Sequence, residues 1–347
     1  MRPALASKML PWFRKNKRDL PWRKTADPYK IWISEIMLQQ TQVKTATPYY
    51  ERWLREFPDI RALARAPLSA VLKKWEGLGY YTRAKNIHQA AKIIAGNYRG
   101  KFPDSFDQIH ALPGIGRYTA GAIASIAFGI PVPVLDGNVM RVLARVFSVS
   151  APIDLPATRK KLWGLAEGIV PQKHPGDFNQ SLMELGATLC TPRNPSCPSC
   201  PLSGSCKARR NGIENSLPRK RKSARTKKVE AVCGIVRCEG KILLEKREEG
   251  LWAGLWQLPT FRVEAAHTPL RALKNGLGTF GVGITREKPE GVLKRSYTVH
   301  QENLHVFSCR GRLKRNRGPN LAWASKKDFK KFPFSSAYAK ILKRYPL

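Results

Sequence analysis

Four cysteines in the second half of the chain have the spacing of a metal site. Cys190, Cys197, Cys200 and Cys206 follow the pattern C-x6-C-x2-C-x5-C. Four thiolates on one compact loop can bind a zinc ion or a [4Fe–4S] cluster. Zinc sites more often contain two separate C-x2-C pairs, whereas this loop contains one. The spacing therefore predicts a metal site and favours an iron–sulfur cluster over zinc; four buried free cysteines are the alternative.

Two carboxylates could carry out acid–base chemistry. Glu35 lies among the apolar residues of segment 31–38. Burial there would raise the pKa of its carboxyl group and suit it to donate a proton, while the alternative is a surface glutamate on an amphipathic helix. Asp136 directly precedes a predicted helix over 137–146, where it could be an N-cap or a carboxylate facing a developing cation. Two carboxylates in different environments suit the cleavage of a glycosidic bond.

A glycine-rich turn could hold a phosphate group. Gly114 and Gly116 stand in the stretch Leu-Pro-Gly-Ile-Gly-Arg-Tyr at 112–118, before a predicted helix over 118–128. Glycine permits close backbone approach, and the free N–H groups of a helix N-terminus attract phosphate. The turn is therefore either purely structural or part of a helix–hairpin–helix motif that grips a DNA backbone without reading its sequence.

The charge of the chain favours the second interpretation. The 347 residues include 62 Lys and Arg but 25 Asp and Glu, so the net charge is +37. A chain this basic repels itself unless it meets a polyanion. Nucleic acid is the first candidate because phosphate neutralisation releases counterions, and an anionic membrane surface is the second. We expect neither a transmembrane helix nor a secretory signal, because the apolar runs are too short.

Two folding patterns follow each other along the chain. Apolar residues recur at helical spacing through the first 212 residues, most clearly in 31–43, 67–75, 83–94 and 118–128. From residue 229 the pattern changes to strands, at 229–236, 241–247 and 303–309, with a turn at Glu239 and Gly240. The intervening segment 214–228 contains seven Lys or Arg and reads as a solvated linker that could also lie along DNA. We predict a multi-domain protein: a helical domain at 1–213, a basic linker at 214–228 and an α/β domain at 229–347.

Taken together, these motifs resemble the MutY-type adenine DNA glycosylases of the endonuclease III superfamily. The resemblance covers nearly the whole chain, and its motifs occur in family order: 20–23, 35–42, 75–81, 112–121, 134–141 and the four cysteines. It implies an all-α helix–hairpin–helix glycosylase domain in two lobes, with a [4Fe–4S] cluster and with DNA and the flipped base between the lobes. It also implies a C-terminal domain related to MutT-like Nudix hydrolases.

The resemblance assigns roles to residues by position. It implies that Glu35 is the general acid that protonates adenine at N7, and that Asp136 stabilises the oxocarbenium ion or forms a covalent intermediate. Asn138 and Tyr118 would support these two carboxylates. Further residues are implied in base and DNA binding: Arg23 and Gln180 in the adenine pocket; Leu38, Gln40, Thr41 and Tyr80 near the mispaired base; Gly114 and Gly116 at the backbone; and His300 at the damaged guanine.

Tyr118 bears on the reaction type. In bifunctional relatives a lysine at this place attacks C1′ and forms a Schiff base, which tyrosine cannot do. We therefore expect a monofunctional glycosylase. The Nudix-like segment 269–278 contains no acidic residue, so metal-dependent pyrophosphate hydrolysis is not expected and a binding role for 8-oxoguanine remains. The recognition loop departs from the family's Phe-Ser-His, because only His300 matches clearly, after Tyr297, Thr298 and Val299.

The sequence thus predicts an adenine glycosylase of base excision repair that acts, as a monomer, on double-stranded DNA with adenine opposite 8-oxoguanine or guanine. Two alternatives stay open: an endonuclease III-like pyrimidine glycosylase with lyase activity, and a non-catalytic iron–sulfur DNA-binding protein. Tyr118 and the C-terminal domain disfavour the first, and the pair Glu35 and Asp136 disfavours the second. The resemblance implies a location at the bacterial nucleoid, or in the nucleus or mitochondria of a eukaryote.

Overall fold

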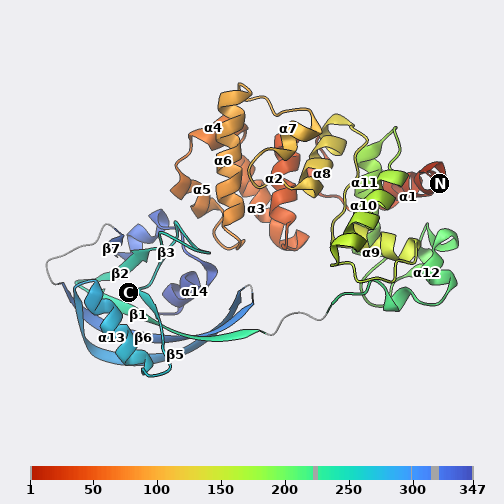
Figure 1. Cartoon of the computed structure of the whole chain (residues 1–347). Coiled ribbons are helices and arrows are strands. Elements are labelled where there is room, and N and C mark those ends of the chain that lie inside the picture. Colours follow the sequence, from red (N-terminus) through yellow and green to blue (C-terminus); the bar gives the residue numbers. More distant parts are fainter. Residues whose placement is uncertain (1, 222–225, 298, 314–319, 346–347) are drawn as a thin grey trace. The chain divides into compact units, whose positions relative to one another are not determined.

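The computed structural model describes residues 2–221, 226–297, 299–313 and 320–345. Contacts between residues divide the chain into two compact units, and each is described by itself below. The first consists of Met1–Arg65 and Asn86–Lys222, and the second of Ala66–Lys85 and Ser223–Leu347 (Figure 1). The predicted fold class is confirmed, because a helical part is followed by a part with a sheet.

The first unit is built from helices. Their bounds are α1 Arg2–Asn16, α2 Pro28–Leu38, α3 Val43–Glu56, α4 Ile60–Arg65, α7 Phe106–His110, α8 Arg117–Phe128, α9 Gly137–Val146, α10 Pro156–Ile169, α11 Pro175–Thr188 and α12 Lys207–Arg210. Helix α6, Thr82–Asn97, begins in the second unit and continues into the first. Short 3-10 turns occur at Pro21–Arg23, Cys197–Ser199, Ser203–Ser205 and Glu214–Ser216. Within the described residues, no helix combines the length and the apolar character needed to cross a membrane.

Apolar side chains from helices distant in sequence form the core of the first unit. Met9, Val142, Leu162 and Phe178, from α1, α9, α10 and α11, belong to one buried cluster. Helix α2 is buried along most of its length and packs on α8. Burial of these apolar faces removes their surface from water, which is the main stabilising contribution to such a bundle. The packing of α2 on α8 also sets the spatial relation between the side chains on these two helices.

One expected helix is shorter than the sequence pattern suggested. Segment 31–43 was expected to be helical throughout, but α2 ends at Leu38 and α3 begins at Val43. Gln40, between them, has a φ of +57°. A non-glycine residue rarely adopts this left-handed conformation, and a right-handed helix cannot continue through it. The other expected helices, over 67–75, 83–94, 118–128 and 137–146, are confirmed as α5, α6, α8 and α9.

The second unit contains a sheet with strand order β3-β2-β1-β6-β5; β4 pairs with β1 and β7 with β2. Strands β1 and β6 are parallel, and the other strand pairs of the described sheet are antiparallel. The bounds are β1 Lys227–Cys238, β2 Lys241–Lys246, β3 Trp256–Gln257, β4 Thr260–Arg262, β5 Val282–Tyr297, β6 His300–Leu313 and β7 Leu321–Ala324. The helical segments are α5 Leu68–Lys74, α13 Pro269–Thr279, α14 Ser336–Arg344 and a 3-10 turn at Lys326–Lys331.

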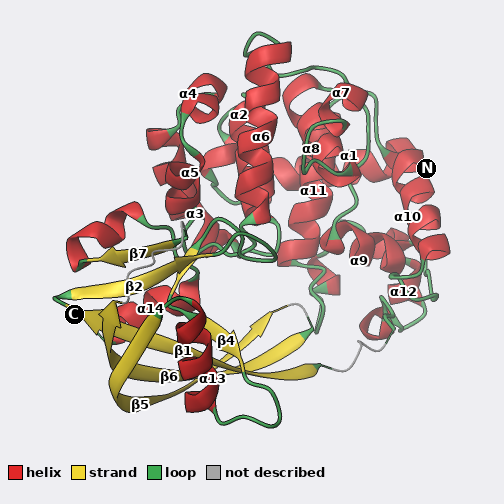
Figure 2. Ribbon diagram, turned by 60° about the vertical axis from the view of Figure 1, so that its left-hand side comes forward, coloured by secondary structure: helices red, strands yellow, loops and turns green. Residues whose placement is uncertain are grey.

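Alternation along β1 gives this sheet two apolar faces, and the ribbons of the sheet and of α13 and α14 can be followed in Figure 2. Ala231, Cys233 and Ile235 belong to the same cluster as residues of α14, whereas Val232 and Val236 cluster with residues of α13. Successive side chains of a strand point to opposite faces, so α13 and α14 cover opposite sides of the sheet. The three predicted strand segments are confirmed in β1, β2 and β6, and the predicted turn at Glu239 and Gly240 links β1 to β2 with positive φ at both residues.

Candidate active site and metal centre

Glu35 is buried at the contact between α2 and α8. Glu35 is 7% exposed. The Tyr118 hydroxyl, on α8, donates a 2.7 Å hydrogen bond to Oε2 of Glu35. The pKa of Glu35 is raised to about 7, mainly by burial and also by the charge of Asp136, against the lowering effects of the Tyr118 hydrogen bond and of Arg23. The carboxyl group is therefore about half protonated at neutral pH. Of the two interpretations of the sequence, Glu35 is therefore a buried acid and not a surface glutamate on an amphipathic helix.

Asp136 caps helix α9 and also accepts a second hydrogen bond, from Asn138. Its Oδ1 accepts a 2.7 Å hydrogen bond from the backbone N–H of Val139, and its Oδ2 accepts one of 2.9 Å from the Asn138 side-chain amide. The expected N-cap is thus confirmed, and the N-terminal end of α9 stabilises a negative charge there. Because the charge of Asp136 acts on both Glu35 and Tyr118, the two carboxylates share one site, which the sequence alone did not show.

A chain of hydrogen bonds runs from Asp136 to the cysteine loop. Arg141 donates from Nη2 to Asn138 Oδ1 at 2.8 Å and from Nε to the carbonyl of Cys190 at 2.7 Å. Arg141 Nη2 also donates a hydrogen bond to the carbonyl of Gly186. A Cβ at position 186 would lie 2.6 Å from Cβ of Asn138, so only glycine lets α11 approach α9 this closely. The sequence analysis missed Arg141, although its position one helical turn after Asn138 is a local signal.

The four cysteines surround one small pocket. Cys190, Cys197, Cys200 and Cys206 all line it, together with the buried Arg145. Arg145 donates from Nη1 to Cys190 Sγ at 3.2 Å and to the carbonyl of Thr191 at 2.8 Å. Burial and then the neighbouring cysteines raise the pKa of Cys200 to about 11, although the backbone of Leu202 opposes this. Four thiolates in this pocket would need compensating positive charge, part of which Arg145 supplies.

The pocket geometry bears on the choice of metal. Among the residues that the structure describes, no group of three or more His, Cys, Asp or Glu side chains is arranged around a single metal ion. The four thiols instead border a common pocket. A polynuclear cluster is wider than a zinc ion and separates its ligand atoms further. A donor set of four sulfur atoms suits either a zinc ion or an iron–sulfur cluster.

Arg23 is held beside the carboxylate site by a residue that the sequence analysis missed. Its Nη2 donates a 2.7 Å hydrogen bond to Oε2 of Glu184, whose side chain is fully buried, and Arg18 makes further bonds to the same carboxylate. Burial alone would raise the pKa of Glu184, but the hydrogen bonds from the two arginines outweigh it and lower the pKa to about 2. Gln180 lies on α11 one turn before Glu184 and is partly buried.

The two glycines of the hairpin, Gly114 and Gly116, play different structural parts. Gly114 has a φ of +75°, and a Cβ there would lie 2.5 Å from Cβ of Asn86. Gly116 is the N-cap of α8, and a Cβ there would meet no atom within 4 Å. Gly114 thus makes the turn, while Gly116 leaves space in front of the first N–H groups of α8. This open approach suits a phosphate oxygen.

Several expected DNA-binding residues lie in the turn after α2 or in the second unit. Leu38 ends α2 and is partly buried, as is Thr41, while Gln40 is exposed. Tyr80 and His300 belong to the second unit; Tyr80 is 53% exposed, and the His300 ring stacks on Tyr297 with centroids 5.4 Å apart. Val299 is exposed, and Thr298 lies outside the described residues.

Comparison with known proteins gives two family matches. Residues 33–167 match the family of HhH-GPD superfamily base excision DNA repair proteins, and residues 231–344 match the NUDIX domain family. The second match begins and ends near the limits of the sheet and its flanking helices.

Curated relatives and solved structures agree with these matches. Adenine DNA glycosylase of Buchnera aphidicola subsp. Schizaphis graminum is 42% identical and covers 73% of this chain and 74% of its own length. The human adenine DNA glycosylase is 44% identical over 62% of this chain and 41% of its own. A thermostable thymine-DNA glycosylase structure is 33% identical, with a TM-score of 0.56 over 60% of this chain and 97% of its own. An endonuclease III–DNA complex, 23% identical with a TM-score of 0.52 over 61% of this chain and 96% of its own, shares the fold.

Proposed function

This chain belongs to the adenine DNA glycosylase family, and from that membership we propose that it excises adenine paired with 8-oxoguanine or guanine. It is a DNA glycosylase of base excision repair, a hydrolase of N-glycosyl bonds that acts on DNA. The observation that carries the proposal is the pairing of a buried Glu35, whose pKa is raised to about 7, with an Asp136 carboxylate at the start of α9. Two carboxylates in such different environments are what N-glycosidic cleavage requires.

Glu35 is the proposed general acid. The glycosidic bond between C1′ and N9 breaks with its electron pair leaving on adenine, and a proton delivered to N7 neutralises the departing base. A carboxyl group whose pKa is raised to about 7 carries this proton in about half of the molecules at neutral pH and gives it up without a large energetic penalty. The Tyr118 hydroxyl fixes the orientation of Glu35 by its hydrogen bond to Oε2.

Asp136 is the proposed partner of the sugar. As the base leaves, positive charge develops at C1′, and the carboxylate stabilises it electrostatically or bonds to it transiently. The Val139 amide and the Asn138 side chain each hold one oxygen of this carboxylate, so it needs no reorganisation when the charge appears. Water then adds to C1′ and loses a proton, which leaves an abasic site.

We propose that the enzyme is monofunctional. A Schiff base requires an amine near C1′, and the hairpin residue at the relevant place is Tyr118, whose hydroxyl is bonded to Glu35. The product strand would therefore stay intact until alkali cleaves it. An endonuclease III-like lyase, the runner-up in the sequence analysis, would instead leave a nicked strand.

We further propose that Cys190, Cys197, Cys200 and Cys206 hold a [4Fe–4S] cluster. When bound, the cluster would supply a covalent crosslink of the loop and a redox-active centre. In this chain Arg145 offsets thiolate charge, and Arg141 joins the loop backbone to Asn138. Protein purified without oxygen should contain about four irons per chain. One zinc and no iron would contradict the assignment.

The remaining sequence assignments are part of the same proposal. Arg23 and Gln180 would contact the flipped adenine, and the glycine hairpin would hold the DNA backbone. Leu38, Gln40, Thr41 and Tyr80 would lie near the mispaired base. In a monomer, the catalytic domain would be 1–213, the basic linker 214–228 and the recognition domain 229–347. His300 and Tyr297 would make the contacts that the altered residues Thr298 and Val299 cannot make.

A strand-cleavage assay tests the function. Duplexes with adenine opposite 8-oxoguanine, adenine opposite guanine, or thymine glycol are incubated with excess enzyme, and half of each sample is treated with alkali. We expect alkali-dependent cleavage at adenine on the first two duplexes and none on the third. Alkali-independent cleavage at thymine glycol would overturn the proposal, and Tyr118→Lys should gain borohydride-trapped adduct because it introduces the missing amine.

A further inference from the structure

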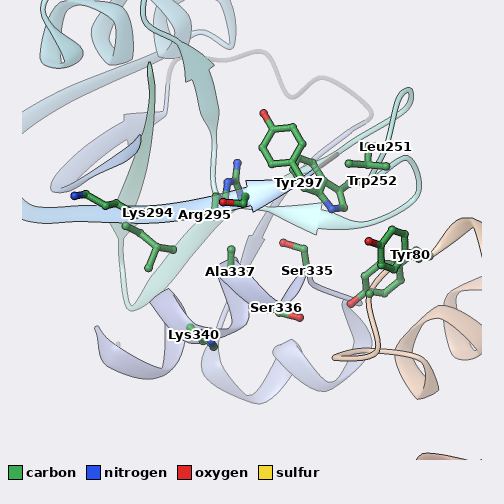
Figure 3. A pocket seen from close by; sticks show the side chains of 14 residues that line it. Tyr80, Leu251, Trp252, Lys294, Arg295, Tyr297, Ser335, Ser336, Ala337 and Lys340 are labelled. Carbon is green, nitrogen blue, oxygen red and sulfur yellow. The ribbon is translucent and has the colours of Figure 1, made fainter. Parts of the chain in front are cut away.

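Two residues that the proposed function does not use lie in the pocket of the cysteine loop. A pocket of the second unit, lined by Tyr80, Trp252 and Tyr297 (Figure 3), belongs instead to the proposed reading of the mispaired base. The pocket that the four cysteines border lies in the first unit, and we call it the cysteine pocket. Ser203 and Glu214 also line the cysteine pocket.

Ser203 places a hydroxyl group without an acceptor at the cysteine pocket. Its Oγ is buried and has no hydrogen-bond partner among the residues that the structure describes. Its backbone N–H donates a 3.0 Å hydrogen bond to the carbonyl of Cys200, which fixes Ser203 beside a cysteine of the same pocket. A buried hydroxyl group costs free energy unless something accepts its hydrogen bond. A sulfur atom held in the pocket is such an acceptor.

Glu214 places a carboxylate at the same pocket. Its Oε2 is buried and, within the described chain, accepts no hydrogen bond. Burial first, and then the charge of Glu214, raise the pKa of the Cys197 thiol, so the carboxylate lies within electrostatic reach of this cysteine. The cysteine pocket therefore contains a negative charge in addition to its thiolates.

The lining of the cysteine pocket strengthens both effects. Val142 and Leu185 are buried apolar residues of this lining. A charge or a hydrogen bond acts more strongly in such surroundings than in water. Among the described residues of the lining, Glu214 is the only Asp or Glu, whereas Arg145 and Arg209 carry positive charge. Replacing Glu214 thus removes all carboxylate charge from the described lining.

We propose that Ser203 and Glu214 shift the reduction potential of the iron–sulfur cluster in opposite directions. The proposal rests on the [4Fe–4S] assignment made under the proposed function. Reduction adds one electron to the cluster, and no bond forms or breaks. The Ser203 hydroxyl donates a hydrogen bond to a sulfur atom, which favours the more negative reduced form and raises the potential. The Glu214 carboxylate repels the added electron and lowers the potential.

Potentiometric titration of the full-length, iron-loaded protein tests both residues. Dithionite serves as the electron donor and ferricyanide as the acceptor, and electron paramagnetic resonance measures the fraction of each form. Glu214→Gln should raise the potential and Ser203→Ala should lower it. Each change should alter the reduction equilibrium about tenfold, which corresponds to about 59 mV for one electron. Opposite signs are the decisive result, because a loosened loop that admits water would move both potentials in the same direction.

Two variants outside the pocket lining are the matched controls. Ser205 lies on the same loop, and its hydroxyl accepts a 3.0 Å hydrogen bond from Lys8. Glu51 is an exposed residue of α3. Ser205→Ala and Glu51→Gln should keep the potential of the unaltered protein. All potentials are measured on the iron-loaded fraction, so partial loss of iron in a variant does not hide a shift.

The possible failures can be told apart. Unchanged potentials in Ser203→Ala and Glu214→Gln, or shifts of the same sign, would overturn the proposal and leave the cluster assignment intact. The absence of any one-electron couple in iron-loaded protein would do the same. Zinc in place of iron would overturn the proposal together with the cluster assignment. Adenine excision by the unaltered protein reports separately on the proposed function.

Discussion

The hydroxyl of Tyr118 on α8 donates a 2.7 Å hydrogen bond to Oε2 of Glu35 on α2. This bond joins two helices of the first unit at a position where burial raises the pKa of the carboxyl group to about 7. A hydrogen bond from a hydroxyl stabilises the ionised form of a carboxyl group, so Tyr118 partly opposes the effect of burial. The balance between these two effects sets the pKa of the proposed acid, and it can be tested from either residue.

The first prediction concerns stability and pH in Glu35→Gln. The pKa of Glu35 is about 7 in the folded chain and near 4.5 when unfolded, so the folded state binds more protons in this window. Relative to Glu35→Gln, the unaltered protein should therefore lose stability as pH rises from 4.5 to 7. Between pH 5 and 8 the variant should gain about 2–3 kcal/mol relative to the unaltered protein. Urea unfolding at both pH values measures this, and parallel curves would refute the burial of Glu35.

The second prediction concerns excision in Tyr118→Phe. Removing the hydroxyl removes the hydrogen bond that lowers the pKa of Glu35, so that pKa should rise above about 7. Excision that depends on the protonated acid should then persist to higher pH than in the unaltered enzyme. Single-turnover rates from pH 5 to 9 give the two profiles. A descending limb that stays in place or moves to lower pH would show that Tyr118 does not act through Glu35.

The third prediction separates the two roles of Asp136. Asn is as good an N-cap as Asp, so Asp136→Asn should change the free energy of unfolding by less than about 1 kcal/mol. The loss of the charge should slow single-turnover excision at least about 100-fold while DNA binding persists. Asp27→Asn is the matched control, because Asp27 caps α2 in the same way and should leave excision nearly unchanged. Equal rates in the two variants would remove Asp136 from the mechanism.

The fourth prediction concerns Arg141, which bonds to Asn138 and to the carbonyls of Gly186 and Cys190. Arg141→Gln leaves buried acceptors without donors and should lower stability by about 2–4 kcal/mol. Because Asn138 loses its anchor, excision should slow at least about tenfold in the molecules that retain iron. Arg209→Gln is the control, since Arg209 makes one exposed bond to the Cys197 carbonyl. The two variants are compared by their single-turnover excision rates per iron-loaded molecule. Equal rates would show that the hydrogen bonds from Asp136 through Asn138 and Arg141 to the cysteine loop do not position Asp136.

Features set by neighbouring residues could be predicted from the sequence. The cysteine spacing, the cap at Asp136 and the turn at Glu239 and Gly240 each involve residues close along the chain, so their residue types carry the signal. The change from helical to strand periodicity likewise gave the fold class, because side-chain patterns repeat locally. The break of the expected helix at Gln40 was the exception, since its left-handed backbone is not dictated by a glycine.

Only the tertiary structure determines the burial, the hydrogen-bond partners and the pKa values of the candidate catalytic residues. Glu35 could be a surface or a buried acid until α8 placed Tyr118 on it, and its pKa follows from that burial. Arg141 and Glu184 were not recognised as functional candidates because their hydrogen-bond partners lie on segments far away in sequence. Burial and electrostatics are sums over all neighbours in space, and a linear pattern records only the neighbours along the chain.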